Sequence, residues 1–325
     1  MKKAILISES TVYKGKDGKI ISRGGGEVYM HNLAKFLLKL GVGVTVFGIK
    51  EFDDQVAQEV IEGVVYERCG VFSRKSFGLF GYLRRAVKKA KEYDFVFVNQ
   101  FVPHLVLPFV KGKKKVAIIH DVYKNEGIGF WISQYGFFVG IIGFLVERVQ
   151  LFFDGKYSDV IMTVSEGSKK KIIRAIGEKA YKKVVICPSV IRENSGNSEI
   201  ANFEKENMLL FVGRFVDYKH PEHVLSVLKK IREIFPDFRA VFVVPRVEEK
   251  TIAFFEDERR RIGIANDWFL IKRCGGDDEV AELMIKAKLL VQPSFIEGQG
   301  IVILEALMAG TPVIAYDLEA YEGML

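Results

Sequence analysis

Short runs of apolar residues alternate with longer amphipathic segments along most of the chain. Many of the runs are rich in Val and Ile, which is typical of parallel strands covered on both faces. The segments between them have helical spacing, as in residues 27–40, where Gly41 is suited to end the helix. This alternation predicts a doubly wound α/β fold. The predicted strands are 4–7, 44–47, 95–98, 116–119, 160–164, 184–186, 209–212, 240–244, 269–271, 289–291 and 313–315.

The alternation stops once, in a polar stretch of Pro, Gly, Asn and Ser at residues 188–206. A chain of 325 residues is also too long for one ordinary core and suits two domains. We therefore predict an N-terminal domain over residues 1–190, a linker over 191–206 and a C-terminal domain over 207–325. Both domains are expected to be Rossmann-like, and the cleft that they face is the expected ligand site.

One segment departs from the usual α/β pattern. Residues 127–146 carry no charge and are long enough for a transmembrane helix. Spanning would place the two halves of one sheet on opposite sides of a bilayer, so an interfacial helix or a shallow re-entrant hairpin is favoured. A fully buried core helix is the alternative. Gly136 and Gly140 form a G-x-x-x-G match, which can mark close helix packing.

The net charge of +7 is unevenly distributed. Residues 1–200 hold 32 Lys and Arg against 20 Asp and Glu, whereas residues 201–325 hold 16 against 21. The basic half, together with the aromatic and basic segment 72–85, predicts an anionic membrane surface as partner, with solvated surface charge as the alternative. No nucleic-acid motif is present, so nucleic acid is not expected. The short apolar stretch at the N-terminus predicts a strand and not a signal peptide, hence a cytoplasmic protein attached peripherally to the membrane.

Cysteine usage excludes two further classes. The three cysteines are far apart in sequence and form no C-x-x-C pair. A disulfide scaffold and a cysteine-based zinc site are therefore not expected.

Residues 292–315 are the most informative for chemistry. A predicted strand leads into a glycine-containing loop, and the helix after it is ended by Gly-Thr-Pro at 310–312. Small residues at a helix N-terminus let backbone N–H groups approach an anion. Glu297 in the loop and Glu305 in the helix are suited to accept hydrogen bonds from sugar hydroxyls. For either glutamate alone a solvent-facing position would be preferred, but the flanking Gly-x-Gly and Gly-Thr-Pro favour a ligand loop.

Other candidates follow predicted strands. Arg214 comes directly after one strand and Lys219 five residues later, where two cations can neutralise a diphosphate, although surface salt bridging is the alternative. His120 ends another strand and is expected to face the ligand crevice, unless it is a packed structural histidine. Glycines 24–26 open the first long helix, but Tyr29 stands where a dinucleotide fingerprint requires glycine.

These motifs resemble, in order, those of the retaining glycosyltransferases with two Rossmann-like domains, the GT-B type. EGQGIVILEALMAGTPVI matches the family's two glutamates separated by seven residues, VGRFVDYKH its diphosphate clamp, and TVSEGSKK at 163–170 a further motif. The resemblance implies transfer of a sugar from a nucleotide-sugar to an acceptor with retained anomeric configuration. Its implied catalytic residues are Glu297, His120, Arg214 and Lys219. Its implied donor-binding residues are Glu305, Gly298, Gln299, Gly300, Arg273, Cys274, Gly25 and Gly26.

Three departures from the family pattern stand out. Gln299 replaces a common aromatic residue, and His220 replaces the glycine that often follows the lysine. The chain also ends 20 residues after Glu305, where family members commonly continue, so it resembles a member truncated at its C-terminus.

No D-x-D motif is present, so neither a metal nor another cofactor is expected. Cations and helix N–H groups would instead stabilise the departing diphosphate. A basic, aromatic first domain favours a lipid-linked or membrane-associated glycan acceptor. Two alternatives stay open: a nucleotide-sugar epimerase, which would turn over donor without acceptor, and a weakly catalytic interaction protein, which would bind membranes but no nucleotide.

Overall fold

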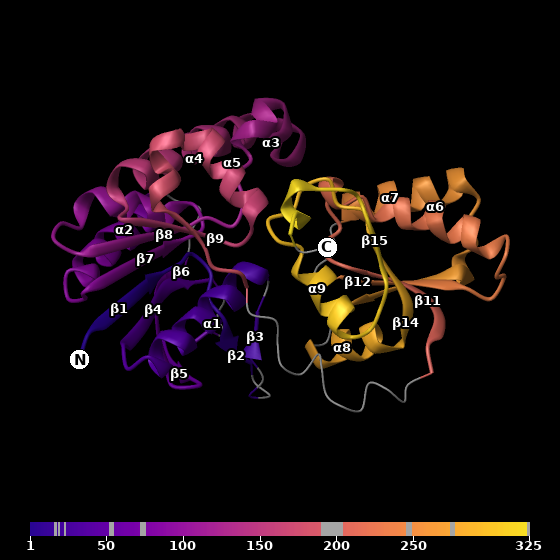
Figure 1. Ribbon diagram of the computed structural model, residues 1–325, viewed down its shortest axis with the longest axis horizontal. Helices are drawn as coiled ribbons and strands as arrows, with labels where there is room; N and C mark the ends of the chain where they lie inside the picture. The colour runs from indigo at the N-terminus through magenta and orange to yellow at the C-terminus, as the bar shows by residue number, and fades with distance from the viewer. Residues whose placement is uncertain are drawn as a thin grey trace. The chain divides into compact units, whose positions relative to one another are not determined.

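The computed structural model describes residues 1–15, 18, 20–22, 24–51, 55–71, 76–189, 204–244, 249–273 and 277–323. Its contacts divide the chain into two units, Met1–Val190 and Ile191–Leu325 (Figure 1). Most of the stretch expected to be a linker lies outside the described residues. The last residue of that stretch, Glu206, already begins strand β11.

Unit 1 is built on an eight-stranded sheet in the order β10-β9-β8-β7-β1-β4-β6-β5. All described neighbours are parallel except β5 and β6, which form an antiparallel hairpin at one edge. The strands are β1 (Lys3–Ile7), β4 (Gly43–Lys50), β5 (Gln58–Ile61), β6 (Val64–Val71), β7 (Phe95–Asn99), β8 (Lys114–Ile118), β9 (Val160–Thr163) and β10 (Val184–Ile186). A separate small hairpin joins β2 (Tyr13–Lys14) to β3 (Ile20–Ile21).

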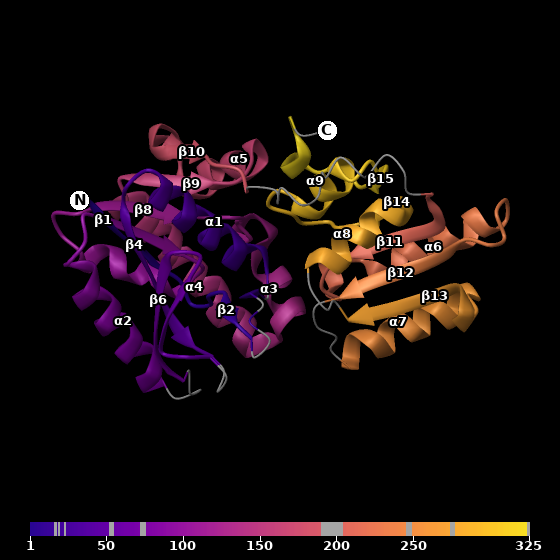
Figure 2. The same ribbon diagram turned by 90° about the horizontal axis from the view of Figure 1, so that it is seen from below.

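Helices cover both faces of this sheet (Figure 2). Its helices are α1 (Gly25–Lys39), α2 (Ser76–Ala90), α3 (Gly127–Tyr135), α4 (Phe137–Tyr157), α5 (Glu166–Ile176) and the 3₁₀ helices η1 (Val102–Phe109), η2 (Lys124–Glu126) and η3 (Glu178–Lys183). Helix α1 packs Tyr29, Met30 and Ala34 on one face. Helices α2, η1, α4 and α5 pack on the other, so alternate residues of each strand enter two separate cores.

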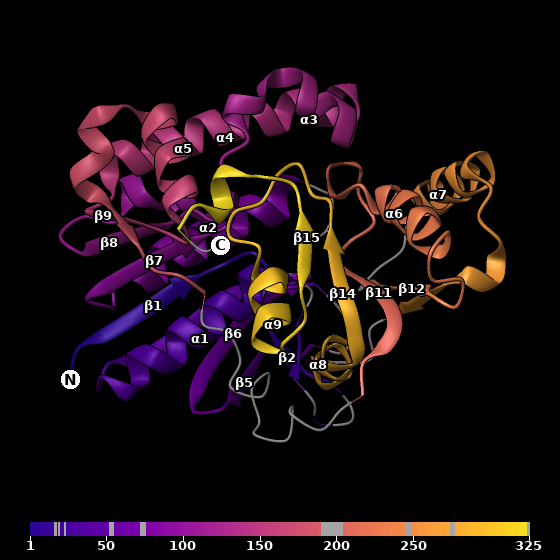
Figure 3. The same cartoon turned by 45° about the vertical axis from the view of Figure 1, so that its right-hand side comes forward.

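Unit 2 has a fully parallel five-stranded sheet in the order β13-β12-β11-β14-β15. Helices α6 and α7 cover one face, and α8 and α9 cover the other (Figure 3). The elements are β11 (Glu206–Val212), β12 (Arg239–Val244), β13 (Phe269–Arg273), β14 (Ala287–Gln292), β15 (Val313–Ala315), α6 (Pro221–Arg232), α7 (Glu249–Ile262), α8 (Asp277–Lys286), α9 (Ile301–Met308) and the 3₁₀ helices η6 (Asp217–Lys219), η7 (Asn266–Trp268) and η8 (Glu319–Tyr321).

The predicted α/β class with two Rossmann-like domains is confirmed, and every predicted strand is present. The hairpins β2–β3 and β5–β6 were not predicted. Hairpin β5–β6 turns through Glu62 and Gly63, both with positive φ, a combination typical of a tight hairpin turn. Strand β5 has only four residues and lies at the sheet edge, and Glu67 and Arg68 interrupt the apolar run of β6, so neither strand gives a long apolar run.

The uncharged run 127–146 forms two helices, α3 and the first half of α4, which break at Gly136 with φ +81°. A Cβ on Gly140 would stand 2.5 Å from the backbone oxygen of Trp131, so the G-x-x-x-G match does mark a close helix crossing. The buried-core interpretation is wrong, because Phe137, Phe138 and several other large apolar residues of α4 are exposed. Among the described residues, every helix falls short of the length and apolar content needed to cross a bilayer.

Candidate functional site

The sheet of unit 2 has a switch point between β11 and β14, the two adjacent strands whose connections leave in opposite directions. Ligands of open α/β sheets bind outside the carboxyl ends of strands at such a point. The loop after β11 carries Arg214 and Lys219, and the loop after β14 carries Glu297. The sheet order thus explains why segments about 80 residues apart in sequence meet at one edge.

Lys219 and Glu297 form an ion pair across these two loops. Both side chains are mostly buried, with 15% and 13% of their surface exposed. The backbone supports the same junction, because Phe295 N donates to Tyr218 O at 2.8 Å. Solvent screens a pair of this kind less than an exposed one, so the ammonium and carboxylate orient each other.

Arg214 remains available at this edge. Its side chain is exposed, and Nη2 donates to the hydroxyl of Tyr218 at 2.6 Å. Within the described part of the chain no carboxylate pairs with it, which argues against ordinary surface salt bridging. A guanidinium held by a neutral hydroxyl retains its charge and most of its donors for an anionic ligand.

The loop Gly298–Gly300 needs its glycine at the last position. Gly300 has φ +72°, and an added Cβ would meet the Tyr321 ring at 2.6 Å. It caps α9, where Glu305 lies half-buried in the second turn. Gln299 is buried, whereas Arg273 is exposed at the end of β13. Cys274 lies outside the described residues.

Unit 1 brings a second set of expected residues together. His120 follows β8, and its Nε2 lies 2.9 Å from Asn99 Oδ1 at the end of β7. Asn99 Nδ2 faces two oxygens at 3.5 Å, those of Ser8 Oγ and the Gly26 carbonyl. The amide oxygen therefore accepts from His120, which places the ring proton on Nε2 and leaves Nδ1 as an acceptor. Gly25 and Gly26 form the first turn of α1.

The environment keeps His120 neutral. Burial lowers its pKa to about 4, and the nearby His104 acts in the same direction. Its ring and that of Tyr29 pack edge to face with centroids 4.9 Å apart, and the Tyr29 hydroxyl donates to Cys187 O at 3.0 Å. At neutral pH this imidazole can accept a hydrogen bond from a hydroxyl and can act as a base, but it brings no positive charge.

The segment 163–170 is hydrogen-bonded to the backbone at His120. Ser168 Oγ donates to His120 O at 3.0 Å, and Ser165 caps α5 by accepting from Ser168 N at 3.1 Å. Lys171 pairs with Asp121 at 3.0 Å, so this member of the basic cluster 169–171 has a structural partner. Asn99 was missed in the sequence, although the rule that selected His120, a polar residue ending an apolar strand, applies to it equally.

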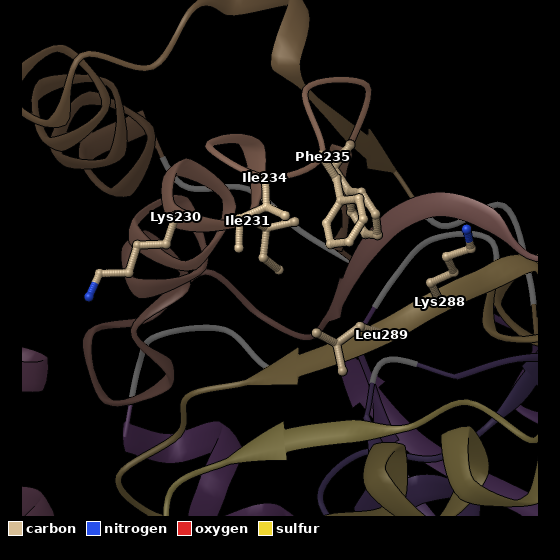
Figure 4. A pocket seen from close by; sticks show the side chains of 7 residues that line it. Lys230, Ile231, Ile234, Phe235, Lys288 and Leu289 are labelled. Atoms are coloured by element: carbon tan, nitrogen blue, oxygen red, sulfur yellow. The ribbon is translucent and has the colours of Figure 1, made fainter.

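Two other features of unit 2 have the shape or the chemistry of a binding site. An apolar hollow of about 390 Å³ lies between the end of α6 and the start of β14, lined by Ile231, Phe235 and Leu289 with Lys230 and Lys288 at its rim (Figure 4). The hollow lies at the amino-terminal end of β14, whereas Arg214, Lys219 and Glu297 follow the carboxyl ends of the strands. A group with metal-ligand chemistry, His220, Glu222 and His223, stands at the start of α6.

Two Rossmann-like units with parallel sheets are the architecture of the GT-B class. Solved structures agree on the fold. Sucrose-phosphate synthase from Thermosynechococcus elongatus gives a TM-score of 0.77 at 18% identity, covering 99% of this chain and 83% of that one. Anabaena Alr3699/HepE, solved in complex with UDP and glucose, gives 0.74 at 17% identity, covering 100% and 83%.

The chain belongs to the glycosyltransferases: residues 23–193 match the family described as Glycosyltransferase Family 4, and residues 194–325 match Glycosyl transferases group 1. The lipopolysaccharide glucosyltransferase WaaG of Escherichia coli K12 is 32% identical over 111 residues, which is 34% of this chain and 28% of WaaG. The uncharacterized glycosyltransferase MJ1607 of Methanocaldococcus jannaschii is 24% identical over 309 residues, which is 90% of this chain and 76% of that protein.

Proposed function

We propose that the protein transfers a hexose from a nucleotide-sugar to a membrane-associated acceptor, with retention of anomeric configuration and without a metal. The observation that carries this proposal is the group of Arg214, Lys219 and Glu297 at the switch point of unit 2. Two cations and a carboxylate suit a ligand that joins a diphosphate to a polyhydroxylated sugar.

In the proposed reaction Arg214 and Lys219 bind the donor phosphates and stabilise the charge that develops as the diphosphate leaves. Glu297 contacts the donor sugar, and its carboxylate favours the positive charge that grows on the ring. Glu305 binds the ribose hydroxyls, and the loop Gly298–Gly300 approaches the phosphates. The nucleobase of the donor lies near Arg273. In unit 1, the turn at Gly25 and Gly26 and the neutral His120 serve the acceptor and the transferred sugar.

The acceptor is proposed to be lipid-linked because the outer face of α4 combines two features. Its large apolar side chains are exposed, and of its four charged residues Arg148 and Lys156 face outward while Glu147 and Asp154 are buried. An apolar surface with exposed cations fits the interface of an anionic membrane. We accordingly place the protein on the cytoplasmic membrane surface. The similarity to WaaG, which is described as a lipopolysaccharide glucosyltransferase, supports such an acceptor.

A thermal-shift panel of UDP-, GDP- and ADP-sugars in EDTA tests the donor first. The best donor is then incubated with protein and a membrane lipid extract, and NMR of the product reports its anomeric configuration. We expect a labelled lipid product with the donor's configuration. Donor consumption without acceptor would favour an epimerase, and an inverted product would contradict the proposed retention.

A further inference from the structure

Two histidines and a glutamate are gathered at the start of α6. His220, Glu222 and His223 come from the sequence His-Pro-Glu-His, and one ligand atom from each lies within 4.8 Å of the others. His220 Nδ1 is 2.7 Å from Glu222 Oε1, and His223 Nε2 is 3.8 Å from the same oxygen. One carboxylate oxygen of Glu222 thus lies near an imidazole nitrogen of each histidine.

The backbone at His220 is unusual. It adopts the left-handed conformation, with φ +45° and ψ +53°. Glycine reaches this conformation without strain, whereas a residue with a Cβ does not. Strained positions of this kind concentrate at ligand-binding sites. In this conformation the His220 imidazole lies beside Glu222, where a glycine would offer no ligand.

Neighbouring aromatic groups orient the two rings. The Tyr316 hydroxyl is hydrogen-bonded to His223 Nδ1 at 3.0 Å, which leaves Nε2 toward Glu222. The Phe295 ring centroid lies 4.1 Å from that of His220 and 5.0 Å from that of Tyr316. An imidazole that binds a metal through one nitrogen commonly has its other nitrogen held by a hydrogen bond in this way.

We propose that His220, Glu222 and His223 bind a divalent transition-metal ion of the zinc class. Two imidazole nitrogens and one carboxylate oxygen suit Zn²⁺, whereas Mg²⁺ and Ca²⁺ prefer ligand sets made of oxygen. The rings now stack 4.6 Å apart and nearly parallel, so they turn out of this stack to converge on the ion. The His223 side chain is 37% exposed and has room to turn. Water completes the coordination, and the site takes no part in the transfer reaction proposed above.

Calorimetric titration of Zn²⁺ into the chelator-treated full chain at pH 7.5 tests the site. We expect one ion bound per chain with a Kd of about 1 μM or tighter, and a loss of at least about tenfold in His223→Gln. His220→Gly should lose Zn²⁺ affinity as well, yet its metal-free form should melt at a higher temperature because the strain is relieved. Glu233→Gln, just beyond the far end of α6, should bind as the parent does.

Equal Zn²⁺ affinity in the parent, His223→Gln and His220→Gly would overturn the proposal, since binding to cysteine thiols or other groups persists in both variants. A parent Kd weaker than about 1 mM would overturn it too. No nucleotide-sugar is present in this experiment, so its failure leaves the proposed transfer reaction untouched.

Discussion

Replacing Phe137, Phe138 and Ile142 with serine should release the protein from anionic membranes while leaving its fold intact. These side chains are 61%, 79% and 62% exposed, so together they present about as much surface as two fully exposed residues. Full burial of one such side chain is worth about 2 kcal/mol. The three therefore contribute about 4 kcal/mol to membrane partitioning, or roughly a thousandfold in affinity.

The assay is sedimentation with vesicles of anionic or neutral lipid at low and high salt. The parent should bind anionic vesicles best, and less at high salt, because Arg148 and Lys156 each add about 1 kcal/mol near an anionic surface. A matched control replaces Ile234 and Phe235, which are 73% and 54% exposed on unit 2, with serine. The control should bind vesicles as the parent does, and the melting temperatures of both variants should stay close to the parent's.

Three outcomes would refute this reasoning. They are a parent that binds no vesicle, a triple variant that binds as well as the parent, and a control that loses binding to the same extent. Unfolding of the triple variant would instead show that this face of α4 is buried in the working protein.

Three further predictions concern single residues. Gly140→Ala should destabilise the α3–α4 hairpin by about 1–3 kcal/mol, seen in urea unfolding, because its Cβ would meet the backbone of Trp131; an unchanged midpoint would contradict the close crossing. The pKa of His120 is about 4 in the folded protein, against an ordinary value near 6.5, so at pH 5 the side chain takes up a proton when the protein unfolds. The free energy of unfolding should therefore fall by about 2 kcal/mol from pH 7 to pH 5. That fall should be smaller by this amount in His120→Gln, and an identical pH profile would show that the histidine is not neutral. Glu297→Gln should lower kcat at least tenfold with a modest change in donor affinity, and a kcat within about twofold of the parent would contradict its role.

Much of the fold was predictable because parallel strands covered on both faces are apolar along their whole length. The strands at 209–212 and 240–244 were found in this way. The hairpin β5–β6 was missed because β5 has only four residues and Glu67 and Arg68 interrupt the apolar run of β6. The helix break at Gly136 was not predicted, because this glycine was interpreted only as part of the G-x-x-x-G match. The sequence also could not tell an exposed helix from a buried one, since exposure depends on what packs against it.

The individual residues of the candidate site could be predicted from the sequence, but their proximity in the fold could not. Glu297, Arg214 and Lys219 could be selected from their places after strands. Their meeting depends on β14 lying beside β11, a sheet order that no local pattern encodes. The same holds for Asn99 in unit 1. Its place in the site depends on its hydrogen bonds to His120 and Gly26, which come from two other segments of the chain.

The most direct test of the account is calorimetric titration of UDP, GDP and ADP into the parent and Arg214→Ala, all in EDTA. Arg239→Ala is the matched control, since Arg239 is an exposed arginine at the other edge of the same sheet. The account predicts that at least one diphosphate binds the parent without metal. It also predicts that Arg214→Ala weakens this binding by about 2 kcal/mol or more, roughly thirtyfold, while the control is unchanged. Equal affinity in Arg214→Ala, or binding that requires Mg²⁺ or Mn²⁺, would contradict it.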